Sequence, residues 1–362
     1  MNGLLAGMLL LWAGVQDAKD PSVADADGPH VFEAEGGWVA MRIVRVDSRL
    51  EVRRDKLEGA TPVIEVPLPG RDKPLKVTLR GTVEAPASSV PAPAKILALS
   101  DIEGNLDALI RLLRAGGAID QDLRWTFGSG QVVYVGDLFD RGLQVTECLW
   151  LLYELEARAA AAGGALHFVL GNHEVMNLTG DFRYVRKKYR ENAKLLEEKL
   201  EDLYSRRSVL GQWLRTRNAV QRIGDEIFVH GGISPEVAES KLSLQELNDA
   251  LRKGLAAETW AKAPEGPLKS VVDGKMGLTW YRGYLKDPID EKAMESILEA
   301  YGARRIAVGH TLVRDVGFVL GGRVLALDVH QAEGVNQAAV CEKAQWHRIY
   351  ADGRRERLGN PR

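Results

Sequence analysis

From Ile96 onward the chain alternates short apolar strands with amphipathic segments. ILALSD (96–101) is typical of a buried strand, and the following NLDALIRLLRAGG places its apolar residues three or four positions apart, as one face of a helix does. QVVYVGD (131–137) and LHFVLGN (166–172) repeat the strand pattern. A chain of this kind must bury each strand beneath helices, so the alternation predicts α/β layers.

Two later stretches predict hairpins. NAVQRI and EIFVHGG flank the Gly224-Asp225 turn, and VGFVLGGRVLALD turns at Gly321-Gly322 after the strand RIAVGH (305–310). The predicted fold is therefore an α/β layered sandwich with mixed β-sheets flanked by helices.

The segment before Ile96 has a different pattern. Residues 27–84 contain short alternating segments rich in β-branched residues, which predict a small β-rich N-terminal domain. Residues 85–95 (APASSVPAPAK) have no periodic apolar face and are typical of a semi-rigid linker. We expect a catalytic domain over 96–350 and a polar tail over 351–362.

The N-terminus carries an apolar run, Leu4 to Val15, followed by charged residues. The run is shorter than the about 20 residues that a bilayer span needs and fits the core of a secretory signal. We predict a signal peptide over residues 1–18, a periplasmic or secreted protein, and no membrane span after cleavage. No Lys or Arg precedes the run, so the alternatives are a retained anchor, or a misassigned start or buried segment.

Charge and cysteine content exclude several classes. The 48 Lys and Arg against 50 Asp and Glu leave a net charge of -2, so no global field attracts nucleic acid. Cys148 and Cys341 are too few for a disulfide scaffold and lack the paired spacing of a zinc site. Any recognition of phosphate must come from a local site.

Such a site is indicated by polar residues at strand ends. Asp101, Asp137, Asn172, His230 and His310 each end an apolar strand. In open α/β sheets functional groups gather at this edge. Together these side chains are oxygen and imidazole donors that can hold divalent metals.

The sequences around these residues are more specific. In order, the chain contains SDIEGN (100–105), GDLFDRG (136–142), GNHE (171–174), HGG (230–232) and GHT (309–311). This set resembles the calcineurin-like metallophosphoesterase superfamily, and within it the phosphoprotein phosphatases. GNHEVMNLTGDFRYV and the later Trp280-Tyr281-Arg282-Gly283 are similar to bacterial Shewanella-like protein phosphatases. The resemblance covers residues 96 to about 335 and does not extend to 27–95.

The resemblance implies two divalent metal ions, manganese first, with iron or zinc as alternatives. Such a pair lies about 3.5–4 Å apart, shares a carboxylate and provides hydroxide for in-line attack on phosphorus. The implied ligands are Asp101 and Glu103 for the first ion, Asp137 as the bridge, and Asn172, His230 and His310 for the second.

One position departs from the family pattern. The first motif usually reads Asp-x-His, and here Glu103 replaces the histidine. A carboxylate can bind the same metals, so Glu103 is either a ligand or the sign of a weakened site. His330, in Leu327-Asp328-Val329-His330, is a hypothetical replacement for the imidazole. Its alternative is an ordinary surface histidine.

The remaining implied roles concern the substrate. His173 protonates the leaving group and Asp140 orients His173. Arg141 and Arg282, with Asn172, hold phosphate oxygens, because a guanidinium matches the geometry of phosphate.

These roles predict a metal-dependent phosphatase. Its substrates are phosphoproteins, with phosphotyrosine suggested by the Shewanella-like resemblance, or small phosphate esters. A phosphodiesterase or dinucleoside polyphosphate hydrolase is the second reading, since the same metals serve it. A catalytically weak phosphate-binding module is the third.

Overall fold

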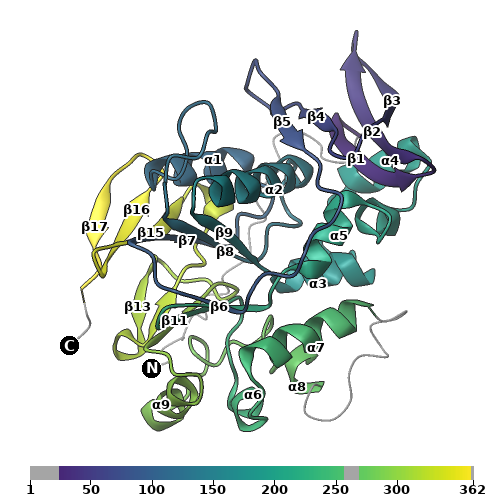
Figure 1. Ribbon diagram of the computed structural model, residues 1–362. Helices are drawn as coiled ribbons and strands as arrows, with labels where there is room; N and C mark the ends of the chain where they lie inside the picture. The colour runs from purple at the N-terminus through teal and green to yellow at the C-terminus, as the bar shows by residue number, and fades with distance from the viewer. Residues whose placement is uncertain (1–23, 257–268, 360–362) are drawn as a thin grey trace, which may run out of the picture.

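The computed structural model describes residues 24–256 and 269–359 of the chain. Two six-stranded mixed sheets lie face to face, with helices on their outer sides (Figure 1). The predicted α/β layered sandwich is therefore confirmed. The predicted signal peptide lies outside the described residues. Within them, no helix is long and apolar enough to cross a membrane.

The first sheet has the order β17-β16-β15-β7-β8-β9, and its strands β7, β8 and β9 are parallel. Its members are β7 (Lys95–Leu99), β8 (Gln131–Val135), β9 (Ala165–Val169), β15 (Gln337–Glu342), β16 (Gln345–Tyr350) and β17 (Arg355–Arg357). Helices α1 (Leu106–Ala115) and α2 (Val145–Ala161) cover its outer face in Figure 1.

The second sheet has the order β13-β14-β12-β11-β10-β6, with β11, β12 and β14 parallel. Both predicted hairpins occur here, as the antiparallel pairs β10–β11 and β13–β14. The strands are β6 (Ser89–Val90), β10 (Val220–Ile223), β11 (Glu226–Val229), β12 (Arg305–Val308), β13 (Gly317–Val319) and β14 (Val324–Ala326). On its outer side lie α6 (Pro235–Glu239), α7 (Leu244–Ala256), α8 (Lys269–Val272) and α9 (Glu291–Ala300).

The alternation of side chains along each strand divides the core into two parts. On β7, Ile96 and Ala98 face the small core between the sheets, whereas Leu97 and Leu99 face the larger core beneath the helices. Successive strand side chains point to opposite faces, so strands covered on both sides are apolar throughout. This packing fixes the strands whose ends carry the polar residues.

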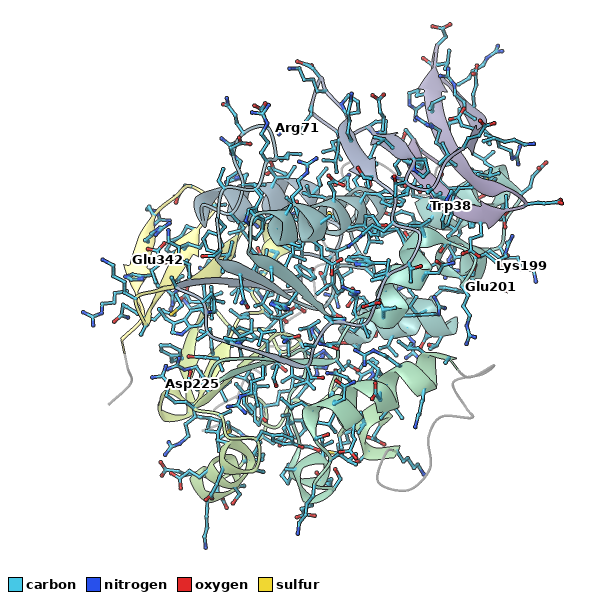
Figure 2. All side chains as sticks on the ribbon, in the orientation of Figure 1. Trp38, Arg71, Lys199, Glu201, Asp225 and Glu342 are labelled. Atoms are coloured by element: carbon cyan, nitrogen blue, oxygen red, sulfur yellow. The ribbon has the colours of Figure 1, made fainter. Side chains whose placement is uncertain are left out.

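The N-terminal strands form a separate antiparallel sheet of β1 (Asp27–Ala34), β2 (Gly37–Val46) and β3 (Arg49–Leu57), with the hairpin β4 (Val63–Val66) and β5 (Leu75–Thr78) beside it. Phe32 and Val77 belong to the same buried core as α2. The Trp150 indole donates to the carbonyl of Pro29 at 2.8 Å. Trp38 lies at the edge of this core (Figure 2).

The helices α3 (Asn172–Thr179), α4 (Lys187–Leu196) and α5 (Val209–Thr216), with the 3-10 turn η1 (Leu200–Tyr204), continue from β9 toward the N-terminal sheet. Short 3-10 turns η4 (Leu320–Gly322) and η5 (Gln331–Glu333) follow β13 and β14. Packing of α4 on β2 and of α5 on β1 joins the two parts of the chain.

Two segments predicted as irregular pair with the sheets. Residues 85–95, predicted as a linker, contain β6, which pairs in parallel with β10 at a sheet edge. Prolines 86, 91 and 93 lack an N–H group, which limits this strand to two residues. In the predicted polar tail, β17 pairs with β16. Open backbone groups at a sheet edge accept such short strands whatever their composition.

Candidate metal and phosphate site

The loops that follow the parallel strands surround one cavity of about 460 Å³. Nearly every residue predicted for the site lines it, and His230 and Asp140 lie buried behind it. The lining includes Asp101, Glu103, Asp137, Arg141, Asn172, His173, Arg282, His310, Asp328 and His330. A wider groove of about 780 Å³ opens beside β5, near Arg71 in Figure 2, but its lining contains no histidine and no buried carboxylate.

The backbone at this cavity adopts an uncommon conformation. Six non-glycine residues of the predicted site have left-handed φ values between 48° and 70°: Asp101, Glu103, Asp137, Asp140, Arg141 and His310. Such conformations cost free energy and gather at functional sites, where the surrounding packing enforces them.

A close approach of two loops explains one glycine. A Cβ atom on Gly171 would collide with the Oδ1 atom and the backbone nitrogen of Asp137. Only glycine lets the loop after β9 lie this close to the loop after β8.

The second of the two predicted metal positions is well formed. One donor atom from each of Asp137, His230 and His310 lies within 4.8 Å of the others. His230 Nε2 lies 3.0 Å from Asp137 Oδ2 and 3.1 Å from Asn172 Oδ1. All four side chains predicted for this ion are therefore adjacent.

Backbone carbonyls orient both imidazoles. His230 Nδ1 donates to the carbonyl of Val135 at 2.8 Å, and His310 Nε2 donates to that of Trp280 at 3.1 Å. The other nitrogen of each ring, His230 Nε2 or His310 Nδ1, is then the one that can bind a cation, the usual arrangement of a metal-binding histidine. His310 Nδ1 also lies 3.4 Å from Arg282 Nη2. These donors fit a divalent metal ion.

The carboxylates that line the cavity favour binding of a cation. Burial and the neighbouring charges of Asp328 and Asp137 raise the pKa of Asp101 well above its ordinary value. Burial raises the pKa of Glu103 to about 7, although Arg141 opposes the shift. Burial raises the pKa of Asp328 to about 7 as well. Three buried carboxylates and the partly buried Glu103 share a site with two arginines, and such crowding is relieved when a metal binds.

The residues predicted for the first metal ion are only partly available to it. Asp101 Oδ2 accepts hydrogen bonds from Ser100 Oγ at 2.5 Å and from the His310 backbone N–H at 3.2 Å. Among the described residues, Oδ1 has no such partner. Glu103 Oε1 instead pairs with Arg141 Nη1 at 2.8 Å. A predicted metal ligand and a predicted phosphate ligand thus contact each other.

His173 lies on α3, and its imidazole ring contacts the buried carboxylate of Asp140. Its Nδ1 lies 2.6 Å from Asp140 Oδ2, and Asn177 Nδ2 donates to both oxygens of Asp140 at 3.1 Å. Burial lowers the pKa of His173, but the charge of Asp137 and the hydrogen bond to Asp140 outweigh it and raise the pKa to about 9. These two carboxylates favour the protonated form of the ring. Sequence reasoning missed Asn177, whose only signal is its position one helical turn after His173.

Arg282 is another residue of the cavity lining. Its Nη1 donates to the carbonyl of His310 at 2.5 Å and to Thr311 Oγ1 at 3.2 Å. These bonds hold the guanidinium at the cavity wall, whereas the Arg141 side chain is 54% exposed.

His330 is not brought into the group of adjacent donors. Its side chain is 47% exposed and its Nδ1 lies 3.4 Å from Glu333 Oε1, at the mouth of the cavity. The residue that lies inside is Asp328, two positions earlier and 6% exposed. Asp328 follows the apolar strand β14 as Asp101 and Asp137 follow theirs, a signal that sequence reasoning missed.

Glu174 was also missed, although it organises the site. Its carboxylate accepts hydrogen bonds from the backbone N–H groups of Asp137 (2.8 Å), Leu138 (2.7 Å), Phe139 (3.2 Å) and Gly171 (2.7 Å). One buried carboxylate thus ties the loop after β8 to the start of α3. The signal was its place three residues after the helix N-cap, where a capping-box glutamate stands.

We predict that Glu174→Ala lowers the free energy of unfolding by about 3–5 kcal/mol, because four buried N–H groups lose their acceptor. Glu174→Gln keeps one acceptor oxygen and should lose about 1–3 kcal/mol. Urea denaturation with an unchanged slope measures both. Glu239→Ala, at an exposed position of α6, is the control and should change stability by less than about 0.5 kcal/mol. Equal stability of all three variants would contradict the role of Glu174.

Comparisons with known proteins agree with this geometry. The calcineurin-like phosphoesterase family matches residues 94–314. Shewanella-like protein phosphatase 2 of Arabidopsis thaliana is 29% identical over 293 residues, which cover 67% of this chain and 72% of the relative. The serine/threonine-protein phosphatase 2B catalytic subunit A2 of Saccharomyces cerevisiae is 34% identical over 166 residues, 45% of this chain and 23% of the relative.

The crystal structure of a cold-active protein-tyrosine phosphatase from a psychrophilic Shewanella has the same fold. It is 32% identical, with a TM-score of 0.83, and the match covers 93% of this chain and all of that one. A match of this extent includes most of residues 27–95, so the expectation that the likeness stops at residue 96 is wrong. The motifs lie after residue 96, in the part of the chain that the family matches.

Proposed function

Because the chain belongs to the calcineurin-like phosphoesterase family, we propose that it hydrolyses phosphate monoesters of proteins, with phosphotyrosine as the preferred side chain. It is a metal-dependent phosphoric ester hydrolase with protein phosphatase homologues. The observation that carries the proposal is the His173–Asp140 pair beside a cavity of buried carboxylates and imidazoles.

We propose two manganese ions as the metals. Asp137, Asn172, His230 and His310 would hold one, and Asp101 with Asp137 would contribute to the other. Such ions supply Lewis acidity toward phosphate oxygens and a water that is deprotonated near neutral pH.

Side chains of the cavity would bind the phosphate group and donate a proton to the leaving group. Asp140 holds His173 Nδ1, so the proton on Nε2 faces the cavity and is available to the departing oxygen. Arg282 offers its guanidinium from the cavity wall to non-bridging phosphate oxygens. Arg141 can do the same once it exchanges the carboxylate of Glu103 for phosphate.

The preference for an aromatic leaving group is supported by two exposed apolar side chains. Tyr184 is 45% exposed and its ring centroid lies 5.1 Å from that of His173. Leu312 is 50% exposed and lines the cavity. An aromatic ring leaving beside His173 would pack against Tyr184. The Shewanella relative, a protein-tyrosine phosphatase by name, agrees with this proposal.

We predict that Tyr184→Ala lowers kcat/KM for a phosphotyrosine peptide by about 3–10-fold and leaves a phosphoserine peptide nearly unchanged, since one aromatic contact is worth about 0.5–1.5 kcal/mol. Tyr184→Phe should keep the preference. The control is Leu195→Ala, which removes an exposed apolar side chain from α4. Equal losses on both peptides would remove Tyr184 from substrate selection.

Neither alternative function is favoured by the relatives that cover most of the chain. Relative kcat/KM values for p-nitrophenyl phosphate and bis-p-nitrophenyl phosphate, with manganese present, test the proposal. We expect the monoester to be hydrolysed faster, because two arginines can bind its terminal oxygens. A faster diester reaction would support the phosphodiesterase reading, and phosphate binding without hydrolysis would support the binding module.

We also propose that residues 1–18 direct export and are removed. The support is the apolar run Leu4 to Val15, of the length of a signal core. N-terminal sequencing of the protein from an exporting bacterial host would show a start after about residue 18. A full-length protein in the cytoplasmic fraction would oppose the proposal.

A further inference from the structure

The cavity contains a carboxylate that the described part of the chain leaves without a partner. Asp328 is 6% exposed and lines the cavity with Asp101, Glu103 and Asp137. Only its backbone is bonded there, since its carbonyl accepts from the Val313 N–H at 2.9 Å. Within residues 24–256 and 269–359, no hydrogen bond or ion pair reaches its side chain. A buried charge of this kind is costly unless something positive offsets it.

Two further carboxylates lie in the same cavity. Asp101 and Asp137 are both buried and line it together with Asp328. Asp101 Oδ2 accepts from Ser100 and His310, and its other oxygen has no hydrogen-bond partner in the described part of the chain. The unpaired oxygens of Asp101 and Asp328 thus belong to one cavity.

The two side chains expected to complete the first metal position have other partners. Glu103 pairs with Arg141 at 2.8 Å. His330 is half-exposed and pairs with Glu333 at 3.4 Å. Asp328 differs from both residues, because its side chain is buried and has no partner among the described residues.

We propose that Asp328 is a ligand of the first divalent cation and shares it with Asp101 and Asp137, whose carboxylates line the same cavity. The inference rests on the proposed function, which requires that cation. Carboxylate oxygens suit manganese and magnesium, whereas the second position offers two imidazoles that suit zinc equally well. Glu103 is then free to hold Arg141 until phosphate replaces it.

The test uses the whole protein and Mn²⁺ as the probe. Wild type, Asp328→Asn and His330→Gln are stripped of metal, titrated with Mn²⁺ by calorimetry, and assayed for bound metal by mass spectrometry. We expect two ions in wild type and His330→Gln. In Asp328→Asn we expect one tight ion and a second that binds at least about 10–100-fold more weakly.

Thermal unfolding adds a readout that does not depend on activity. Without metal, Asp328→Asn should melt at or above the wild-type temperature, because it removes one of several clustered like charges. With Mn²⁺, its gain in melting temperature should be smaller than that of wild type. A damaged fold would lower the melting temperature without metal. Loss of a metal ligand instead reduces only the gain in melting temperature that Mn²⁺ gives.

Three results would overturn the inference. Asp328→Asn could bind two ions with wild-type affinity, which is expected if Asp328 carries a proton instead of facing a cation. His330→Gln could lose the ion instead, which would assign the position to the histidine. If wild type binds no Mn²⁺ and is inactive with it, the proposed function fails together with the inference.

Discussion

His173→Asn should lower kcat for phenyl phosphate by about 10²–10⁴-fold, the range typical of a lost general acid. The structure supports so large an effect because His173 Nδ1 is held by Asp140 at 2.6 Å and the pKa of His173 is raised to about 9. The hydrogen bond to Asp140 favours a protonated ring whose Nε2 can donate to the leaving group. Steady-state kinetics at saturating substrate and manganese measure the loss.

The leaving group provides the internal control for this prediction. With p-nitrophenyl phosphate the departing phenolate needs less help from a proton, so the loss in kcat should be smaller than with phenyl phosphate. Manganese content should stay at the wild-type value. His347→Asn, on β16 and outside the cavity lining, should behave as wild type. Equal losses on both esters, accompanied by loss of metal, would show instead that His173 supports the metal site.

The strand pattern was sufficient to predict the main features of the site. Asp101, Asp137, Asn172, His230 and His310 were singled out because each follows an apolar strand, and the structure gathers the ends of these strands around one cavity. Parallel strands of one sheet present their carboxyl ends to the same edge, which places Asp101, Asp137 and Asn172 together. His230 and His310 follow strands of the second sheet and reach the cavity because the two sheets lie face to face. The predicted sandwich of mixed sheets follows from the same alternation.

Partnerships between loops were not predictable in this way. The contact of Glu103 with Arg141 and the four backbone bonds of Glu174 depend on how the loop after β8 lies against its neighbours. The choice between Asp328 and His330 depends on the direction of the chain after β14, which separates a buried side chain from a half-exposed one two residues later. The periodicity of apolar residues in the sequence does not indicate the direction that the chain takes after β14.

The N-terminal part illustrates the same limit at a larger scale. Alternating apolar residues predicted its strands, and the sheet β1–β2–β3 confirms them. The pattern could not show that these strands share a core with α2, or that Ser89 and Val90 extend the edge of a distant sheet. Both results depend on surfaces supplied by residues more than 60 positions away in the chain.

Asp137→Asn should lower kcat/KM for any phosphate ester by about 10³-fold or more. Its Oδ2 lies 3.0 Å from His230 Nε2, its Oδ1 accepts from the His173 N–H at 3.0 Å, and its backbone N–H donates to Glu174. Metal ions contribute several kcal/mol to phosphoryl transfer, and each 1.4 kcal/mol corresponds to about tenfold in rate. Asparagine keeps the shape and the backbone bonds but removes the charge that two cations would share.

Chelation of the wild type should reproduce that loss without a mutation. Treatment with EDTA and gel filtration should reduce hydrolysis to the level of Asp137→Asn, and added Mn²⁺ should restore wild type but not the variant. Metal removal should also lower the melting temperature of the wild type, because Asp101, Glu103, Asp137 and Asp328 then face one another without a cation. An enzyme that keeps its activity and melting temperature after complete metal removal would mean that these acids are neutralised by protons, and the cavity would need a chemistry other than metal-assisted hydrolysis.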